Sequence, residues 1–217
     1  MTGPRRVTPG RSGRLRLRHS LDVAERGAHL LEQKLRVLSA EHARLLNAAE
    51  AAGHTWGELL SEAERWLLRG LLLGGEQALD GAAVGIDAAE AEVSWTTSMG
   101  VRHPAAASVS VPSRPPTAAV PANTALVHAE TSYARALRAA GEYTAVRTAA
   151  ELVGAEVART RLRVRALRRH WIPRLRDTLA RADLALEQAE HEDGVRRRWA
   201  AAGRSPAGAD EHGRGES

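Results

Sequence analysis

The sequence predicts a mainly α-helical fold, in which N- and C-terminal helices form a long antiparallel two-helix coiled coil with a small β-hairpin region between them. Three observations predict it. Two long segments, one in each half of the chain, repeat apolar residues at alternating steps of four and three. The residues between them alternate like strands and contain several prolines. Phe is absent and aromatic residues make up 3% of the chain, which suits long helices better than a thick globular core.

The first segment carries an apolar seam from Leu17 to Ala49 with one polar member, His42. An apolar residue every 3.5 positions forms a narrow stripe, which requires a second helix to cover it. The spacing continues to Trp66, and helix propensity is lost at Gly74 and the glycines after it. The seam positions are Leu17, Leu21, Ala24, Ala28, Leu31, Leu35, Leu38, His42, Leu45 and Ala49.

The middle of the chain predicts a β-hairpin. Val93, Trp95 and Thr97 alternate with polar residues, which is the period of a strand, and Val109 and Val111 alternate in the same way. Met99-Gly100 and His103-Pro104 supply turn residues between the two runs. Four prolines between 112 and 121 then exclude regular structure until a second helix begins.

The second helix carries the same 4-3 rhythm from Val146 to Trp171. The next seam position is Leu175, a 4-4 step, and an insertion of this kind locally unwinds a supercoil. Pro173 lies inside this step and is expected to bend the helix. The seam positions are Val146, Ala150, Val153, Val157, Thr160, Val164, Leu167 and Trp171, followed by Leu175, Leu179, Ala182, Leu186 and Ala189.

Together these patterns divide the chain into five segments. We expect a flexible basic arm at 1–12, a helix at 13–79, a hairpin and connector region at 80–121, a second helix at 122–200 and a disordered tail at 201–217. A connector of this length allows the second helix to fold back on the first. The alternative is a homodimer of parallel helices, which the seam pattern also permits.

Several classes of site are excluded by the residues present. The chain has no cysteine, so it forms neither a disulfide nor a thiolate metal site. The histidines do not recur at metal-ligand spacing, and no catalytic constellation or cofactor motif is visible. The most apolar run, Trp66 to Leu73, is broken by Arg69 and is far shorter than the ~20 residues that a membrane span requires. We therefore expect a soluble protein that is not itself an enzyme.

Positive charge is concentrated in two places. The formal net charge is +5, Lys34 is the only lysine, and no acidic residue occurs among the arginines between Val157 and Arg176. The chain before residue 20 is also basic. An exposed, solvated helix face would give this pattern, and so would a surface that binds an acidic or carbonyl-rich partner. Nucleic-acid binding is a further alternative, although aromatic residues are not interleaved with the arginines and no docking motif is visible.

Three stretches, in this order and covering about residues 5–200, resemble the D subunits of V-type and archaeal-type rotary ATPases. The first is a basic-leucine opening at Arg14 followed by Gly-x-x-Leu-Leu-x-x-Lys from Gly27 to Lys34. The second is Met-Gly-Val-x-x-Pro, formed by Met99, Gly100, Val101 and Pro104. The third runs from Arg161 to Leu167 and into Ile-Pro-Arg-Leu at 172–175, with acidic residues at 187–193. Arg165, Arg168 and Gly194-Val195 depart from the family pattern, and the tail after Ala200 has no counterpart.

The resemblance implies a central-stalk axle, or rotor, without an active site or cofactor of its own. Its implied partners are the A and B subunits of the catalytic hexamer, the F subunit, and the adaptor subunit on the membrane ring. It implies a cytoplasmic location, peripheral to the membrane, and a role in ion transport and ATP synthesis or hydrolysis. Met99, Gly100, Val101 and Pro104 form a candidate regulatory hairpin. The candidate coupling surface consists of a basic opening (Arg14, Arg16, Arg18) and an arginine band (Arg161, Arg163, Arg165, Arg168, Arg169, Arg174).

Overall fold

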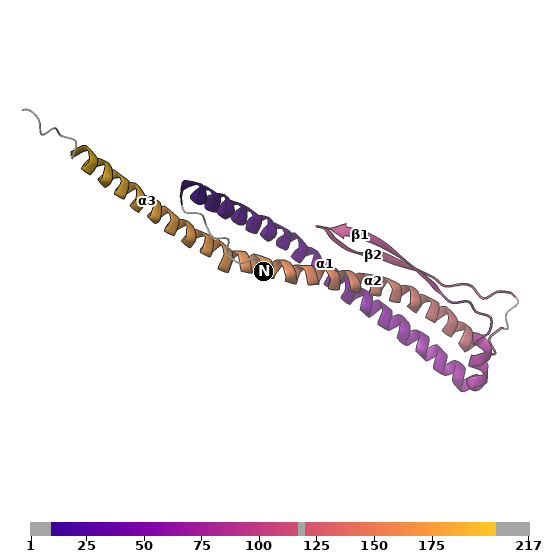
Figure 1. Ribbon diagram of the computed structural model, residues 1–217. Coiled ribbons are helices and arrows are strands. Elements are labelled where there is room, and N and C mark those ends of the chain that lie inside the picture. The colour runs from indigo at the N-terminus through magenta and orange to yellow at the C-terminus, as the bar shows by residue number, and fades with distance from the viewer. Residues whose placement is uncertain (1–9, 117–119, 203–217) are drawn as a thin grey trace, which may run out of the picture. The chain divides into compact units, whose positions relative to one another are not determined.

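The computed structural model describes residues 10–116 and 120–202, so the expectations for residues 1–9 and 203–217 lie outside the described residues (Figure 1). Helix α1 spans Arg11–Ala83, strands β1 and β2 span Glu90–Ser98 and Val101–Ser110, and helix α2 spans Thr124–Ala166. A π-helix, η1, follows at Leu167–Trp171 and leads into helix α3 at Ile172–Ala202. The predicted fold class, a long helix pair with a two-stranded antiparallel hairpin between its helices, is confirmed.

The described residues form two compact units, 30–163 and 10–29 with 164–202, and each is described by itself. In unit 30–163, the seam residues Leu38 and Leu45 pack against Ala149 and Val153 of α2. Lys34 pairs with Glu156 at one end of this contact, whereas Trp66 lies against His128 farther along. Residues later in α1 therefore contact residues earlier in α2. The pair is antiparallel and lies within one chain.

His42, the polar member of the first seam, is accommodated by a glycine on the facing helix. A Cβ atom added at Gly154 would lie 2.7 Å from Nε2 of His42, so the imidazole ring lies directly against the α2 backbone. Farther along, Gly53 leaves room for the ring of Tyr143, which stacks on Trp56 with 5.4 Å between ring centroids. Glycines opposite bulky rings keep the two helices close.

In the other unit, Ala24 and Ala28 of α1 pack against Ile172 of α3, with Leu167 and Leu175 on either side. The seam assignment of Trp171 is wrong: this side chain is 54% exposed, whereas Ile172 is 2% exposed. The reason is η1, in which the Ile172 N–H donates to the carbonyl of Leu167, five residues back. A π turn holds one residue more than an α turn, and this moves the buried position from 171 to 172.

The bend at Pro173 remains a prediction, and in the structure η1 ends at Trp171, two residues before Pro173. Proline has no N–H to donate to the carbonyl four residues earlier, here that of Arg169. The wider hydrogen-bonding pattern therefore occurs where the α pattern already lacks a donor.

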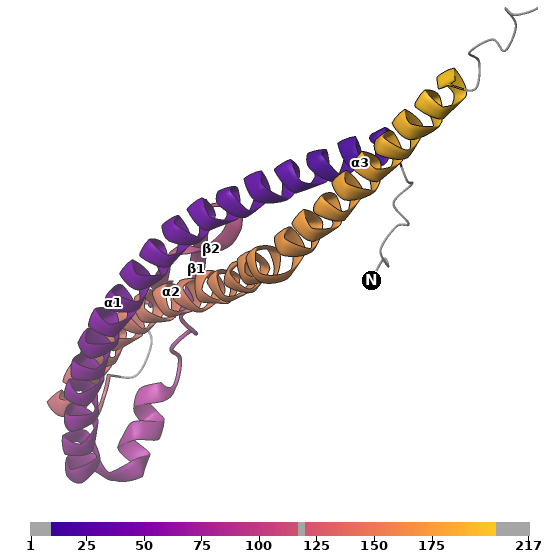
Figure 2. The ribbon, with the colours of Figure 1, turned by 90° about the vertical axis from the view of Figure 1, so that its left-hand side faces the viewer.

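Helix α1 is interrupted at Gly75, which has φ 67° and ψ −174°. This left-handed backbone is accessible to glycine at little cost, and Figure 2 shows the last turns of α1 folding back after it. The loss of helix propensity at Gly74-Gly75 therefore coincides with a break, although helical residues continue to Ala83. Within the described residues, no helix is both long and apolar enough to cross a membrane.

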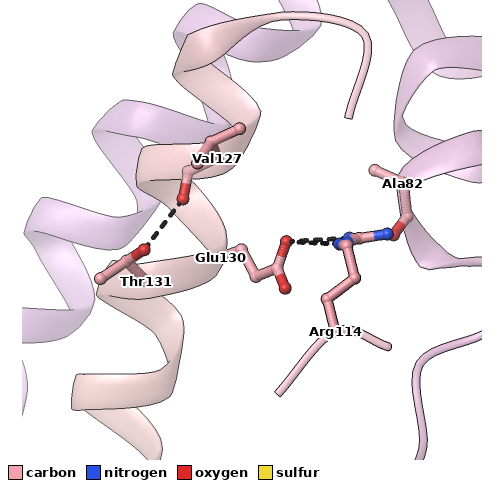
Figure 3. Close-up of polar contacts among 5 residues, drawn as sticks. All are labelled: Ala82, Arg114, Val127, Glu130 and Thr131. Carbon is pink, nitrogen blue, oxygen red and sulfur yellow. Dashed lines mark hydrogen bonds and ion pairs between the residues drawn. The ribbon is translucent and has the colours of Figure 1, made fainter. Parts of the chain in front are cut away.

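The connector is held to both helices by Arg114, whose side chain is mostly buried (Figure 3). Its guanidinium donates to a carboxylate oxygen of Glu130 in α2 at 2.8 Å and to the carbonyl of Ala82 at 2.7 Å. The carbonyls at the end of a helix lack intrahelical donors, so the second bond caps the C-terminus of α1. One arginine thus joins the connector, α1 and α2.

Candidate interaction surfaces

The tip of the hairpin is a two-residue turn formed by Met99 and Gly100, between the paired residues Ser98 and Val101. Both turn residues have positive φ, 49° and 81°, as in the type I′ turn, whose twist matches that of the flanking strands. Met99 is exposed at this tip. The Met-Gly part of the motif therefore faces solvent.

The Val-x-x-Pro part of the motif is packed rather than exposed to solvent. Val101 packs against the core cluster of the long helix pair, and Pro104 is buried. Pro104 pairs with Trp95 beside a register shift. The interstrand hydrogen bonds are already irregular at such a shift, so a residue without an N–H is tolerated there. Val109 lies against Gly141 of α2, where an added Cβ would come within 2.5 Å of it. Strand β2 thus faces the helices, and Figure 1 shows the hairpin running beside them.

Strand β1 is exposed along almost its whole length, which the sequence did not predict. Val93 and Trp95 alternate as expected of a half-buried strand, yet both are exposed. Trp95 instead lies beneath the guanidinium of Arg102 from β2, 4.9 Å from the ring centroid, in a cation–π contact. Only one strand of the hairpin lies against the helices.

A buried histidine in β2 was missed by the sequence analysis. His103 is 3% exposed, its Nδ1 lies 3.0 Å from the carbonyl of Pro104, and its Nε2 has no hydrogen-bond partner within the described residues. The available signal was its spacing of two from Val101, which places both residues on one face of the strand. The sequence analysis instead assigned His103 and Pro104 to a turn, which is wrong, because both are paired residues of strand β2.

The basic opening contains two different kinds of arginine. Arg14 is half-buried and forms an ion pair with Asp183 of α3. Arg16 and Arg18 are exposed. Arg14 therefore contributes to the contact between α1 and α3, whereas the other two present their charge to solvent.

The arginine band lies along the continuous run of α2, η1 and α3, and all of its members are exposed. Within the described residues, no ion pair is formed by Arg161, Arg163, Arg165, Arg169 or Arg174. The arginines that flank the band are paired: Arg159 with Glu156 at 3.7 Å and Arg176 with Glu25 at 2.6 Å. These five members of the band thus display positive charge that no acidic side chain of the described chain neutralises by direct pairing.

The described surfaces carry no cluster of metal-ligand side chains. Across 10–116 and 120–202, there is no group of three or more His, Asp or Glu residues placed to hold a metal ion. The carboxylates of Glu190, Glu192 and Asp193 pair with arginines on exposed faces. What the described surfaces offer is charge and apolar area for contact.

Lys34 and Glu156 form a partly buried ion pair between α1 and α2, 3.1 Å from Nζ to Oε1. The hydrogen bond from Lys34 is the main reason why the pKa of Glu156 lies below its usual range, and it outweighs the opposing effect of burial. A carboxyl group with a lower pKa in the folded state stabilises folding at pH above its ordinary pKa. This stabilisation is lost as the pH falls through the lowered pKa.

We therefore expect Glu156→Gln to lower the free energy of unfolding at neutral pH by about 1 kcal/mol, since the pair is only partly shielded from solvent. The difference from the unsubstituted chain should shrink as the pH falls below the carboxyl range. Urea unfolding at a series of pH values measures it. Glu151→Gln, at an exposed pair with Arg147, is the control. A difference that did not change with pH would contradict the assignment.

The comparisons with known proteins agree with this geometry. The family model for the D subunit of ATP synthase matches residues 14–202. The D subunits of the V-type ATP synthases from two strains of Thermus thermophilus are each 29% identical to the chain over 198 residues. Each alignment covers 88% of this chain and 85% of the relative.

Proposed function

Because the chain belongs to the family of ATP synthase D subunits, we propose that it is the central-stalk rotor, or axle, of a V/A-type rotary ATPase or ATP synthase. The single observation that carries the proposal is the arginine band, a set of exposed cations on a helical segment that packs against a second helix. A braced pair resists twisting better than one helix does. Exposed charges keep most of the face of such a pair hydrated, so that it can move past a surrounding protein.

In this proposal, the axle couples chemistry in the surrounding subunits to ion translocation. The A and B subunits form a hexamer that binds and hydrolyses or synthesises ATP, and the axle contributes no catalytic group. An asymmetric shaft favours one arrangement of the hexamer at each orientation, so a change of nucleotide state shifts the preferred orientation. The band and the exposed residues Arg16 and Arg18 form the coupling surface.

The same proposal assigns contact positions on the shaft to the other partners. The F subunit and the adaptor subunit of the membrane ring contact the shaft away from the coupling surface, and the Met99–Gly100 tip modulates activity or contacts the foot of the stalk. The complex is peripheral to the membrane on its cytoplasmic side. Support for a contact role at the tip comes from its exposure and from the firm packing of β2 behind it.

Co-purification with a tagged chain, followed by native mass spectrometry, tests the proposal. The expected result is one copy of the chain with three A and three B subunits and with the F subunit attached. Recovery of a homodimer alone, or of nucleic acid without ATPase subunits, would refute the axle function. Salt titration identifies the nucleic-acid case, since phosphate-driven binding falls steeply with ionic strength.

Replacing Arg161, Arg163 and Arg165 together by Ala should lower ion pumping per ATP hydrolysed about fivefold, the equivalent of ~1 kcal/mol of coupling from several exposed charges. Helix content should not change, because all three side chains are exposed. The assay is ATP-driven ion uptake and ATP hydrolysis in reconstituted vesicles, with circular dichroism of the isolated chain.

A control with the same loss of charge removes three exposed arginines outside the band, and its coupling should stay at the level of the unsubstituted complex. If both triple variants behave alike, the band is an ordinary solvated face. The control residues are Arg44, Arg135 and Arg147.

A further inference from the structure

The π-helix η1 accommodates one residue more than the heptad rhythm requires. From 164 to 179, the Val, Leu and Ile residues that are buried or half-buried are Val164, Leu167, Ile172, Leu175 and Leu179. The steps between them are three, five, three and four, and the single step of five falls on η1. Without the extra residue, the rhythm would be regular. Single π turns within α-helices are rare and occur frequently at functional sites.

The consequence of this turn is that an aromatic side chain lies outside the core. Ile172 fills the space against Ala24 and Ala28, and Trp171 is left 54% exposed beside it. Within the described residues, Trp171 forms no ring-stacking or cation–π contact. Trp is among the residues that contribute most when buried at an interface, because it carries a large apolar area with few rotatable bonds.

The surroundings of Trp171 are strongly positive. Arg174 lies three residues farther along, which places it next to Trp171 on the helix surface. Arg174 is exposed and forms no ion pair within the described residues, and His170 and Arg169 before it are exposed as well. On α1, Glu25 is bound to Arg176. Trp and Arg are both enriched among the residues that contribute most to binding energy at interfaces.

We propose that Trp171 and Arg174 form a docking knob that inserts into an apolar pocket bordered by carboxylates on a partner protein. Resting on the proposed function, this inference places the pocket on the A and B subunits around the shaft. Trp171 supplies apolar area, and Arg174 pairs with a carboxylate at the pocket edge. The π turn holds both side chains outward while α3 keeps its packing on α1.

The knob is tested by titrating the full chain into the A and B subunits assembled without it, and measuring the fraction bound by native mass spectrometry. Trp171→Ala should weaken binding at least tenfold, and Trp171→Phe should retain most of the affinity. Arg174→Glu should weaken binding by a similar factor. Trp199→Ala is the matched control, since Trp199 is 79% exposed on the same helix α3 and should be dispensable.

Hydroxyl-radical footprinting of the assembled complex gives a second readout. Oxidation of Trp171 should fall several-fold on assembly. If the unsubstituted chain assembles but Trp171→Ala binds equally well, or if Trp171 is oxidised at the same rate free and assembled, the knob is refuted and the axle function stands. If the unsubstituted chain does not assemble with A and B subunits at all, both proposals fail.

Discussion

Leu38→Ala is expected to lower the free energy of unfolding by about 3 kcal/mol, within the range for truncation of a fully buried leucine. Leu38 is 0% exposed and lies in the cluster formed with Leu45, Ala149 and Val153. Its neighbours on α2 include alanines, which have no side chain long enough to fill the space that the substitution leaves. Urea unfolding followed by circular dichroism measures the loss.

Leu30→Ala is the control for this substitution, because it makes the same chemical change in the same helix at a residue that is 63% exposed. Its effect should stay within about 0.5 kcal/mol. Equal losses at the two positions would mean that the seam on α1 is not the buried face of the helix pair.

At η1, truncation of the smaller side chain should have the larger effect on stability. Ile172→Ala is expected to cost about 3 kcal/mol, since Ile172 is 2% exposed and packs on Ala24 and Ala28. Trp171→Ala removes far more atoms but should cost less than about 1 kcal/mol, because most of them already face solvent. Thermal and urea unfolding of the two single variants measure the difference.

The opposite order of the two effects would mean that Trp171 occupies the core and that the helix is α-helical throughout. This is what the steps of four from Leu167 to Trp171 and from Trp171 to Leu175 predict. Trp171→Phe provides an internal check, because it should unfold like the unsubstituted chain if residue 171 is at the surface.

Which of Trp171 and Ile172 is buried could not be predicted from the sequence. Both residues are apolar and adjacent, and each continues the seam from Leu167, at a step of four or of five. The heptad spacing favours the step of four to Trp171, because an α-helix is the usual helical conformation. The hydrogen bond from Ile172 to Leu167 and the missing donor at Pro173 favour five, and these are backbone properties that periodicity does not measure.

The hairpin was predicted from alternation and from the turn residues between the two runs, and these gave its presence but not its orientation. Val93 and Trp95 suggested that β1 has a buried face, whereas the structure buries His103 and Pro104 of β2. Which strand faces the helices depends on the register shift at Ser94/Trp95 and on the close fit of Val109 to Gly141. Both involve residues that are distant in sequence.

The candidate surface was predictable as a set of charges but not as a set of free charges. Arg14 and Arg16 look equivalent in the sequence, and only the pairing with Asp183 on a distant helix separates them. Similarly, nothing near Arg114 indicated that it would bind both Glu130 and the end of α1. Such partners are determined by tertiary folding.

The buried His103 also bears on how firmly the hairpin is held. Its Nε2 has no hydrogen-bond partner among the described residues, so no such bond from this atom helps to hold the hairpin on the helices. Separation of the hairpin from the helices would expose the apolar contacts of Val101 and Val109 and leave the cluster around Leu38 and Val153 in place. The hairpin should therefore open locally at a much lower free energy than the helix pair unfolds, and its amide hydrogens should exchange earlier than those of the core of α1 and α2.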